Sequence, residues 1–129
     1  MGQPAAKQGD RVTATDTHLI QAPGPTAPAP VPHPFSGMLD GSLSPDVTIE
    51  GRAAATVTST ATNTPPHLPQ GGTFVNPPTN RATVVSGSAT VTINGRPAAR
   101  HGDRATTCND PVALPVGSVV ATSTVSVGG

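Results

Sequence analysis

"VTINGRPAARHGD", residues 91–103, occurs three times in related forms along this chain. The other two copies are "VTIEGRAAATVTS" at 47–59 and "GQPAAKQGD" at 2–10. When Gly2, Gly51 and Gly95 are aligned, the pairs Ala5-Ala6, Ala54-Ala55 and Ala98-Ala99 fall in one column, and Gly9-Asp10 matches Gly102-Asp103. The middle copy has Thr58-Ser59 in place of Gly-Asp. An internal repeat of this kind predicts three similar structural units.

The two ends of the chain complement each other. The first copy has no preceding Val-Thr-Ile segment, whereas the last such segment, in "STVSVGG" (123–129), has no Pro-Ala-Ala after it. We therefore expect a closed ring of three units, because closure removes exposed sheet edges. The predicted single domain, 1–129, has repeat units at about 2–20, 41–67 and 87–110, and residues 117–129 close the ring. Gly-Ser pairs at 41–42, 87–88 and 117–118 are aligned as further repeat markers.

The units resemble short strands joined by turns. "SATVTI" (88–93) alternates apolar and polar residues with period two, and Asn94-Gly95 is a strong hairpin signal. These patterns predict an all-β fold of short hairpins with pseudo-threefold symmetry, strands around 47–50, 88–94 and 119–127, and no substantial helix. Two Pro-rich insertions, 21–37 and 65–80, are expected to run as extended polyproline II without joining strand ladders.

Composition limits the function. The 129 residues include 14 Gly and 16 Pro but no Trp or Tyr, so the interior is small, and low-complexity disorder is one alternative. Seven basic residues balance seven acidic ones, which disfavours nucleic acid as a partner. The N-terminus has no apolar core typical of a signal peptide, and we expect synthesis in the cytoplasm, with export only by a dedicated machine.

Three repeats each end near a residue that can bind a metal. His18 and His67 lie at equivalent distances from Gly2 and Gly51, and Cys108 ends the third copy. With threefold symmetry these side chains converge near the axis, and His33 completes four ligands. Such a set suits tetrahedral Zn²⁺, with Fe²⁺ as the less favoured ion. His101 occupies a different position and is interpreted as a surface residue, while Asp10 and Asp103 are assigned to turns.

The repeats resemble those of the PAAR-repeat proteins, named for the motif present here as Pro97-Ala98-Ala99-Arg100. The resemblance implies a metal-stabilised conical tip, with the metal near the apex and His18, His33, His67 and Cys108 as ligands. It also implies a structural, non-enzymatic role: one tip caps a trimeric VgrG-like spike of an extracellular phage-tail-like particle or a type VI secretion system. Effector cargo and transient contact with the target membrane are implied as well, with delivery of the tip on the particle.

Two other functions are compatible with the residues. One is a small Zn-stabilised interaction or scaffold module whose Pro-rich loops bind recognition domains. The other is a metalloenzyme that uses Cys108 with a His, although the chain has little interior in which to form a catalytic pocket.

Overall fold

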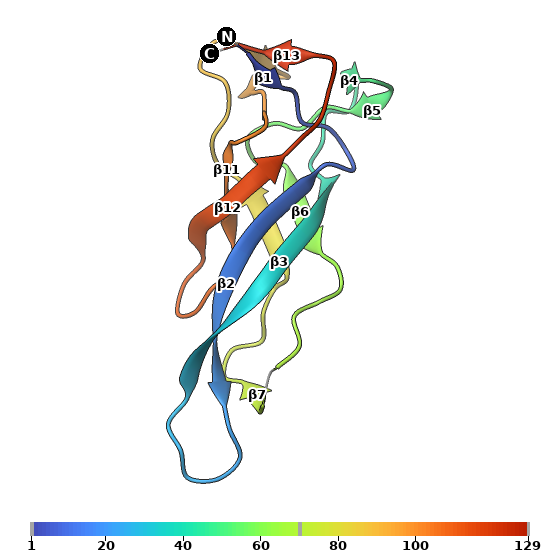
Figure 1. Ribbon diagram of the computed structural model, residues 1–129. Helices are drawn as coiled ribbons and strands as arrows, with labels where there is room; N and C mark the ends of the chain where they lie inside the picture. The colour runs from blue at the N-terminus through green and yellow to red at the C-terminus, as the bar shows by residue number, and fades with distance from the viewer. Residues whose placement is uncertain (1, 70, 129) are drawn as a thin grey trace.

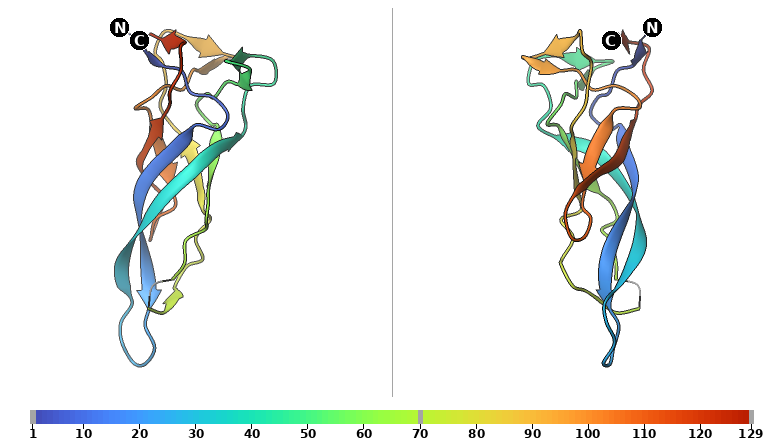
Figure 2. Two further views of the ribbon diagram at one scale, coloured as in Figure 1. Left: turned by 45° about the vertical axis from the view of Figure 1, so that its right-hand side comes forward. Right: turned by 90° about the vertical axis from the view of Figure 1, so that its left-hand side faces the viewer.

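The computed structural model describes residues 2–69 and 71–128, and these contain no helix, as predicted for an all-β chain. Its strands are β1 (Gln3–Pro4), β2 (Arg11–Gln21), β3 (Ala29–Gly41), β4 (Thr48–Ile49), β5 (Arg52–Ala53), β6 (Thr60–Asn63), β7 (Thr73–Phe74), β8 (Arg81–Val84), β9 (Thr92–Ile93), β10 (Arg96–Pro97), β11 (Arg104–Thr107), β12 (Leu114–Val120) and β13 (Ser126–Val127). In the described part of the chain, nothing forms a helix long and apolar enough to cross a membrane. The molecule is elongated, with both termini at a broad end and the β2–β3 turn at a narrow end (Figures 1 and 2).

Three small hairpins form the broad end, which we call the plate. They are the antiparallel pairs β4–β5, β9–β10 and β1–β13. The first two are local in sequence, but the third joins Gln3 to Val127 across the whole chain. The C-terminal segment thus pairs with the N-terminal one, as a closed ring requires, and three similar strand pairs surround one axis.

A cyclic set of backbone hydrogen bonds holds the plate together. Ala6 N–H donates to Ala99 O, Ala99 N–H to Ala55 O and Ala55 N–H to Ala6 O, each over 3.0 Å. All three alanines are at most 1% exposed. Three chains approach this closely only if their side chains are small, because a larger group would overlap its neighbours in a close-packed interior. The repeated Ala pair is thus required by the packing around the axis.

The turn after each Ala pair is also equivalent in the three units. The side chains of Asp10, Ser59 and Asp103 accept hydrogen bonds from the backbone N–H of the residue three positions earlier, over 3.0, 2.9 and 2.7 Å. Ser59 therefore replaces Asp in the middle copy without loss of this bond. The residue before it, Thr58, has φ of 84°, close to the 93° of Gly9 and the 88° of Gly102. The middle copy keeps the turn although its residues differ.

The alignment of Gly41-Ser42 with Gly87-Ser88 is wrong by two residues. The Oγ atoms of Ser44 and Ser88 each accept a hydrogen bond from the N–H three residues on, Val47 and Val91, over 2.9 Å. Ser44 is therefore the equivalent of Ser88. Gly41 lies six residues before Val47, whereas Gly87 lies four residues before Val91, so the two Gly-Ser pairs are not at equivalent positions.

Below the plate, each unit continues into a pair of strands. The pairs β2–β3, β6–β8 and β11–β12 lie in the sheet order β12-β11-β8-β6-β3-β2, and pairing of β12 with β2 closes a six-stranded barrel. Alternate residues point inward, as expected for strands. The barrel interior includes Val12, Leu39, Ala61, Val84, Ala105 and Val119.

The second half of the first Pro-rich insertion, from Ala29 on, belongs to strand β3, contrary to expectation. β3 pairs with β2 over ten consecutive residues, from Arg11↔Met38 to Ile20↔Ala29. Ser36, two residues after Pro34, bonds through its backbone N–H and C=O to Asn63 and Thr64, on the side away from β2. Because backbone groups alternate in direction along a strand, Pro30, Pro32 and Pro34 also lack their N–H on that side, where no ladder bond to β2 is lost.

Two further predictions need correction. In the second insertion, 65–80, residues Thr73–Phe74 form β7 and pair with the end of β2. The stretch predicted as one strand at 119–127 is divided: β12 belongs to the barrel and β13 to the plate. We call residues 16–36, 64–80 and 108–117 the pointed half, since the β2–β3 hairpin and β7 extend from the barrel toward the narrow end (Figure 1).

Candidate metal centre

The start of the pointed half brings together side chains from all three units. β2 contributes Asp16 and His18, which lie two residues apart and so share one face of the strand. His67 follows β6, and Cys108 follows β11 directly. All four are buried, and one ligand atom from each lies within 4.8 Å of the others. The structure therefore contains a buried cluster that could bind a metal ion.

The distances within this cluster are close to those of a tetrahedral site. Bonds of about 2.0–2.3 Å place neighbouring ligand atoms of a tetrahedron about 3.3–3.8 Å apart. The Sγ atom of Cys108 lies 3.8 Å from His18 Nε2 and 3.3 Å from Asp16 Oδ2. His67 Nε2 lies 2.9 Å from Asp16 Oδ2. The donors thus need only a small separation to surround one ion.

The fourth predicted ligand, His33, lies beside this cluster. It is the pairing partner of Asp16 on β3, and its ring centroid is 5.4 Å from those of His18 and His67. Its Nδ1 lies 2.9 Å from the backbone oxygen of Val31, an arrangement in which Nδ1–H donates and Nε2 keeps its lone pair. The structure therefore brings all four predicted residues together and adds Asp16, which the sequence analysis missed.

Both phenylalanines of the chain pack against these imidazoles. Phe74 on β7 lies 5.6 Å from the rings of His18 and His33, and Phe35 on β3 lies 6.0 Å from that of His67, all measured between centroids. These contacts exclude water from two sides of the histidines. The short β7 strand, which pairs with Ile20 and Gln21, places Phe74 there.

Within residues 2–69 and 71–128, two buried nitrogen atoms in or beside the cluster have no hydrogen-bond partner: His18 Nδ1 and His33 Nε2. Burial of an unpaired polar atom is costly, and such atoms are rare in native proteins. A metal ion would remove this cost at His33 by accepting its lone pair. His18 Nδ1 lies 3.6 Å from Asp110 Oδ2, and carboxylates near the second ring nitrogen are common around metal-bound histidines. The donor set and its surroundings therefore fit a metal ion.

The neighbouring residues hold the ligands in position. Asp16 Oδ1 accepts hydrogen bonds from the Thr107 hydroxyl and, over 3.4 Å, from the Asn109 amide. The amide of Asn63 lies 3.3 Å from His67 Nδ1 and orients that ring. Such outer hydrogen bonds matter at metal sites because they orient the ligand side chains toward the ion.

Burial changes the protonation of two donors. It raises the pKa of the Cys108 thiol to about 11, with the nearby Asp16 carboxylate as the second cause. Burial also lowers the pKa of His18, and the positive charge that His67 can carry adds to this effect. Without a metal ion, Cys108 is thus a thiol and His18 is neutral at pH 7. A metal cation would stabilise the thiolate that it binds.

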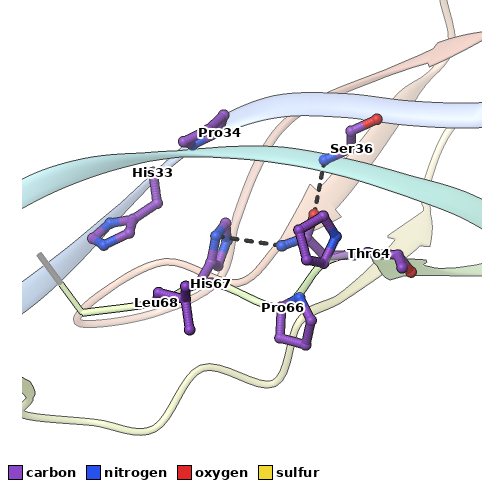
Figure 3. Close-up of a pocket in the computed structure, with 9 residues that line it drawn as sticks. His33, Pro34, Ser36, Thr64, Pro66, His67 and Leu68 are labelled. Carbon is purple, nitrogen blue, oxygen red and sulfur yellow. Dashed lines mark hydrogen bonds between the residues drawn. The ribbon is translucent and has the colours of Figure 1, made fainter.

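A cavity of about 270 Å³ opens beside the cluster and is lined by residues of β3 and of the segment after β6. His33 and His67 lie beside each other in its lining, which also includes the apolar side chains of Pro34, Pro66 and Leu68 (Figure 3). This opening gives a route by which an ion could reach the two imidazoles from solvent.

The signal for Asp16 was present in the sequence. Within "RVTATDTHLI" (11–20), Val12, Ala14, Asp16 and His18 occur at alternate positions, so Asp16 shares the face of His18. An acidic residue on an inward face indicates a ligand or a buried ion pair. The other assignments agree with the structure: His101 is exposed, with its Nδ1 accepting the Ala121 N–H over 3.1 Å, and Asp10 and Asp103 are turn residues.

Comparison with known proteins identifies the family. The PAAR motif family model matches residues 21–114 and, in a second match, 75–129. No curated protein matches the chain significantly. Repeats, all-β fold and family match agree, and the chain therefore belongs to the PAAR-motif family, the structural proteins associated with the spike tips of contractile injection and type VI secretion systems.

Proposed function

We propose that one copy of this protein caps the blunt end of a trimeric, VgrG-like spike, with its plate against the spike and its pointed half leading. The observation that carries this proposal is the threefold surface of the plate. Val47, Val91 and Val125 each accept a backbone hydrogen bond from the first residue of an Ala pair, and they are 36%, 36% and 43% exposed. One folded chain thus offers three equivalent apolar positions to three identical subunits.

The plate also provides backbone groups for this contact. Its hairpins are only two strands wide, so each has edges that can pair with a strand of another chain. Next to the valines, the equivalent residues Thr48, Thr92 and Ser126 are exposed as well. Small polar and β-branched residues at the three sites suit continuation of a β-structured spike.

The pointed half has the properties expected of a leading end. Beyond the metal cluster, residues 17–36, 64–80 and 111–117 contain no Lys, Arg, Asp or Glu. Exposed apolar side chains in these segments include Leu68, Val75, Val112, Leu114 and Val116. An uncharged surface avoids the large cost of taking charges into lipid, which favours transient passage through a target membrane.

We assign Zn²⁺ to the cluster as the ion that holds the pointed half together. Imidazole and thiolate donors in a tetrahedral arrangement favour Zn²⁺, with Fe²⁺ as the less favoured ion. The proposed role is mechanical, and we expect the tip to be made in the bacterial cytoplasm, assembled on the particle and delivered with it. Effector cargo would travel with the same assembly.

Native mass spectrometry of the tip mixed with its spike partner tests the proposal. We expect one tip per spike trimer, and we expect a Val47→Asp, Val91→Asp variant to lose at least tenfold in affinity because two charges would be buried at the interface. Val75→Asp, in a valine of the pointed half that is 43% exposed, as Val125 is, serves as the matched control and should bind as the unmodified protein does. Three tips per trimer would refute capping by one threefold tip, and equal loss in both variants would show that the plate is not the spike-binding face.

A further inference from the structure

The carboxylate of Asp16 lacks a fixed positive partner. Asp16 is fully buried, and in the part of the chain that the structure describes its only ion-pair partner is His67, not a lysine or arginine. Buried charges in proteins are either paired or bound to metal ions. Neutral groups, Thr107 and Asn109, hold one oxygen of this carboxylate. The other oxygen, Oδ2, faces His67 and Cys108.

We propose that Asp16 is a reserve ligand, able to replace either Cys108 or His33 at the metal ion. The proposal rests on metal binding at this cluster, as assigned above. Asp16 Oδ2 lies 3.3 Å from Cys108 Sγ and 2.9 Å from His67 Nε2, so the same ion can reach either the carboxylate or the thiolate with little movement. Asp16 and His33 are directly opposite each other on β2 and β3. With His33 beside it, its ring centroid 5.4 Å from those of His18 and His67, the cluster offers five donors for the four positions of a tetrahedral ion.

Charge explains why the fifth donor is a carboxylate. Three neutral imidazoles and one thiolate leave a divalent ion with one uncompensated positive charge in a buried site. A carboxylate at ligand distance or just outside the ligand shell makes the site neutral, which lowers the cost of burial. If Cys108 is lost, Asp16 supplies the fourth ligand together with His18, His33 and His67. If His33 is lost, Asp16 completes a set with His18, His67 and Cys108.

A double-mutant cycle with Asp16→Asn and Cys108→Ser tests this exchange. Zn²⁺ affinity is measured by competition with a chelator, and Co²⁺ absorption reports the ligand number and the presence of a thiolate. Each single variant should keep one tetrahedral ion per chain with less than about tenfold loss of affinity, because four donors remain. Cys108→Ser should lose only the thiolate-to-cobalt charge-transfer band. The double variant should lose more than about a hundredfold, well beyond the sum of the single effects.

A second cycle, with Asp16→Asn and His33→Ala, keeps the test decisive if Cys108→Ser does not fold. His33→Ala alone should keep a tetrahedral, thiolate-bound Co²⁺ ion, and adding Asp16→Asn should open a ligand position to water. An outer residue that only orients a ligand typically costs about 10–100-fold in affinity, equally in each background. Equal losses from Asp16→Asn in all backgrounds would therefore overturn the reserve-ligand proposal.

The outcomes separate this inference from the proposed function. Loss of all metal in Cys108→Ser or in His33→Ala, with Asp16 intact, refutes the exchange but leaves the metal site and the spike-binding plate in place. An unmodified protein that binds neither Zn²⁺ nor Co²⁺ refutes metal binding itself. Spike binding by the plate is measured separately, on the Val47 and Val91 positions.

Discussion

The plate and the pointed half of this protein are held together in different ways. In the plate, three copies of one sequence bond to each other through their backbones, with Ala6, Ala55 and Ala99 in a closed cycle. Below the plate the copies diverge: β2 pairs with β3 over ten residues and continues into the pointed half, whereas β6 pairs with β8 over three, within the barrel. There the contacts are made by side chains, among them three histidines and two phenylalanines. The threefold symmetry is therefore retained in the plate, where backbones contact each other, and lost in the pointed half, where different side chains make the contacts.

Metal removal should have the largest effect, because it should destabilise the pointed half and leave the plate folded. In the described residues of the pointed half, the buried apolar side chains besides Cys108 are Ile20 and Phe35, so we expect chelation to cost several kcal/mol of folding free energy and to lower the melting temperature sharply. Limited proteolysis should then cut first in 64–80, while the plate stays protected. The double variant Asp16→Asn, His67→Ala, which leaves three ligands, should reproduce both effects.

The matched control for metal removal is His101→Ala. This exposed histidine accepts one hydrogen bond from Ala121 N–H and lies in the turn between β10 and β11, outside the metal cluster, so its loss should leave metal content unchanged and have only a small effect on melting. Metal loss in His101→Ala, or unchanged melting after chelation, would contradict the assignment of the cluster.

Ala55→Leu should destabilise the plate without changing metal binding at the cluster. Ala55 is fully buried and bonded to two other units, so a larger side chain forces the three backbones apart. Overpacking of this kind costs about 1–3 kcal/mol, to be measured by denaturant unfolding with the metal bound. Ala113→Leu, at an exposed position of the pointed half, should be neutral. Equal stability of the two variants would show that close approach of the backbones is not what the Ala pairs provide.

How much of this could be predicted depended on the kind of signal. The repeat predicted the ring and its closure, because equivalent backbone bonds require equivalent small residues. His18, His67 and Cys108 were recognised as residue types that bind metals. Asp16 was missed because a strand at 11–21 was not predicted. Without that strand, nothing indicated that the side chain of Asp16 points to the same side as that of His18. β3 was missed because the high number of prolines was taken to exclude a strand. These prolines occur at alternate positions, where their missing N–H groups leave the bonds to β2 intact.

The smallest predicted effect concerns a single turn. Thr58 has φ of 84°, where a β-branched residue is strained, while the equivalent Gly102 has φ of 88°. Thr58→Gly should therefore stabilise the protein by about 1 kcal/mol. The reverse change, Gly102→Thr, should destabilise it by about 1–2 kcal/mol through the backbone alone, since a Cβ there meets no atom within 4 Å. Thermal melting of both variants compares the turns of the middle and third repeats directly. Shifts of the melting temperature in the same direction would contradict backbone strain at Thr58.

The pairing of β1 with β13 makes one plate hairpin unlike the other two. Its strands are joined by no turn, so it can form only after the chain between Gln3 and Val127 has been brought into a ring. Contacts so distant in sequence carry the largest loop-closure entropy and form late in folding. This hairpin is thus the seam of the ring, where fraying should begin. A circular permutant that joins the present ends and opens the chain between β8 and β9 would move the seam to another unit, with the same final contacts but a different order of assembly.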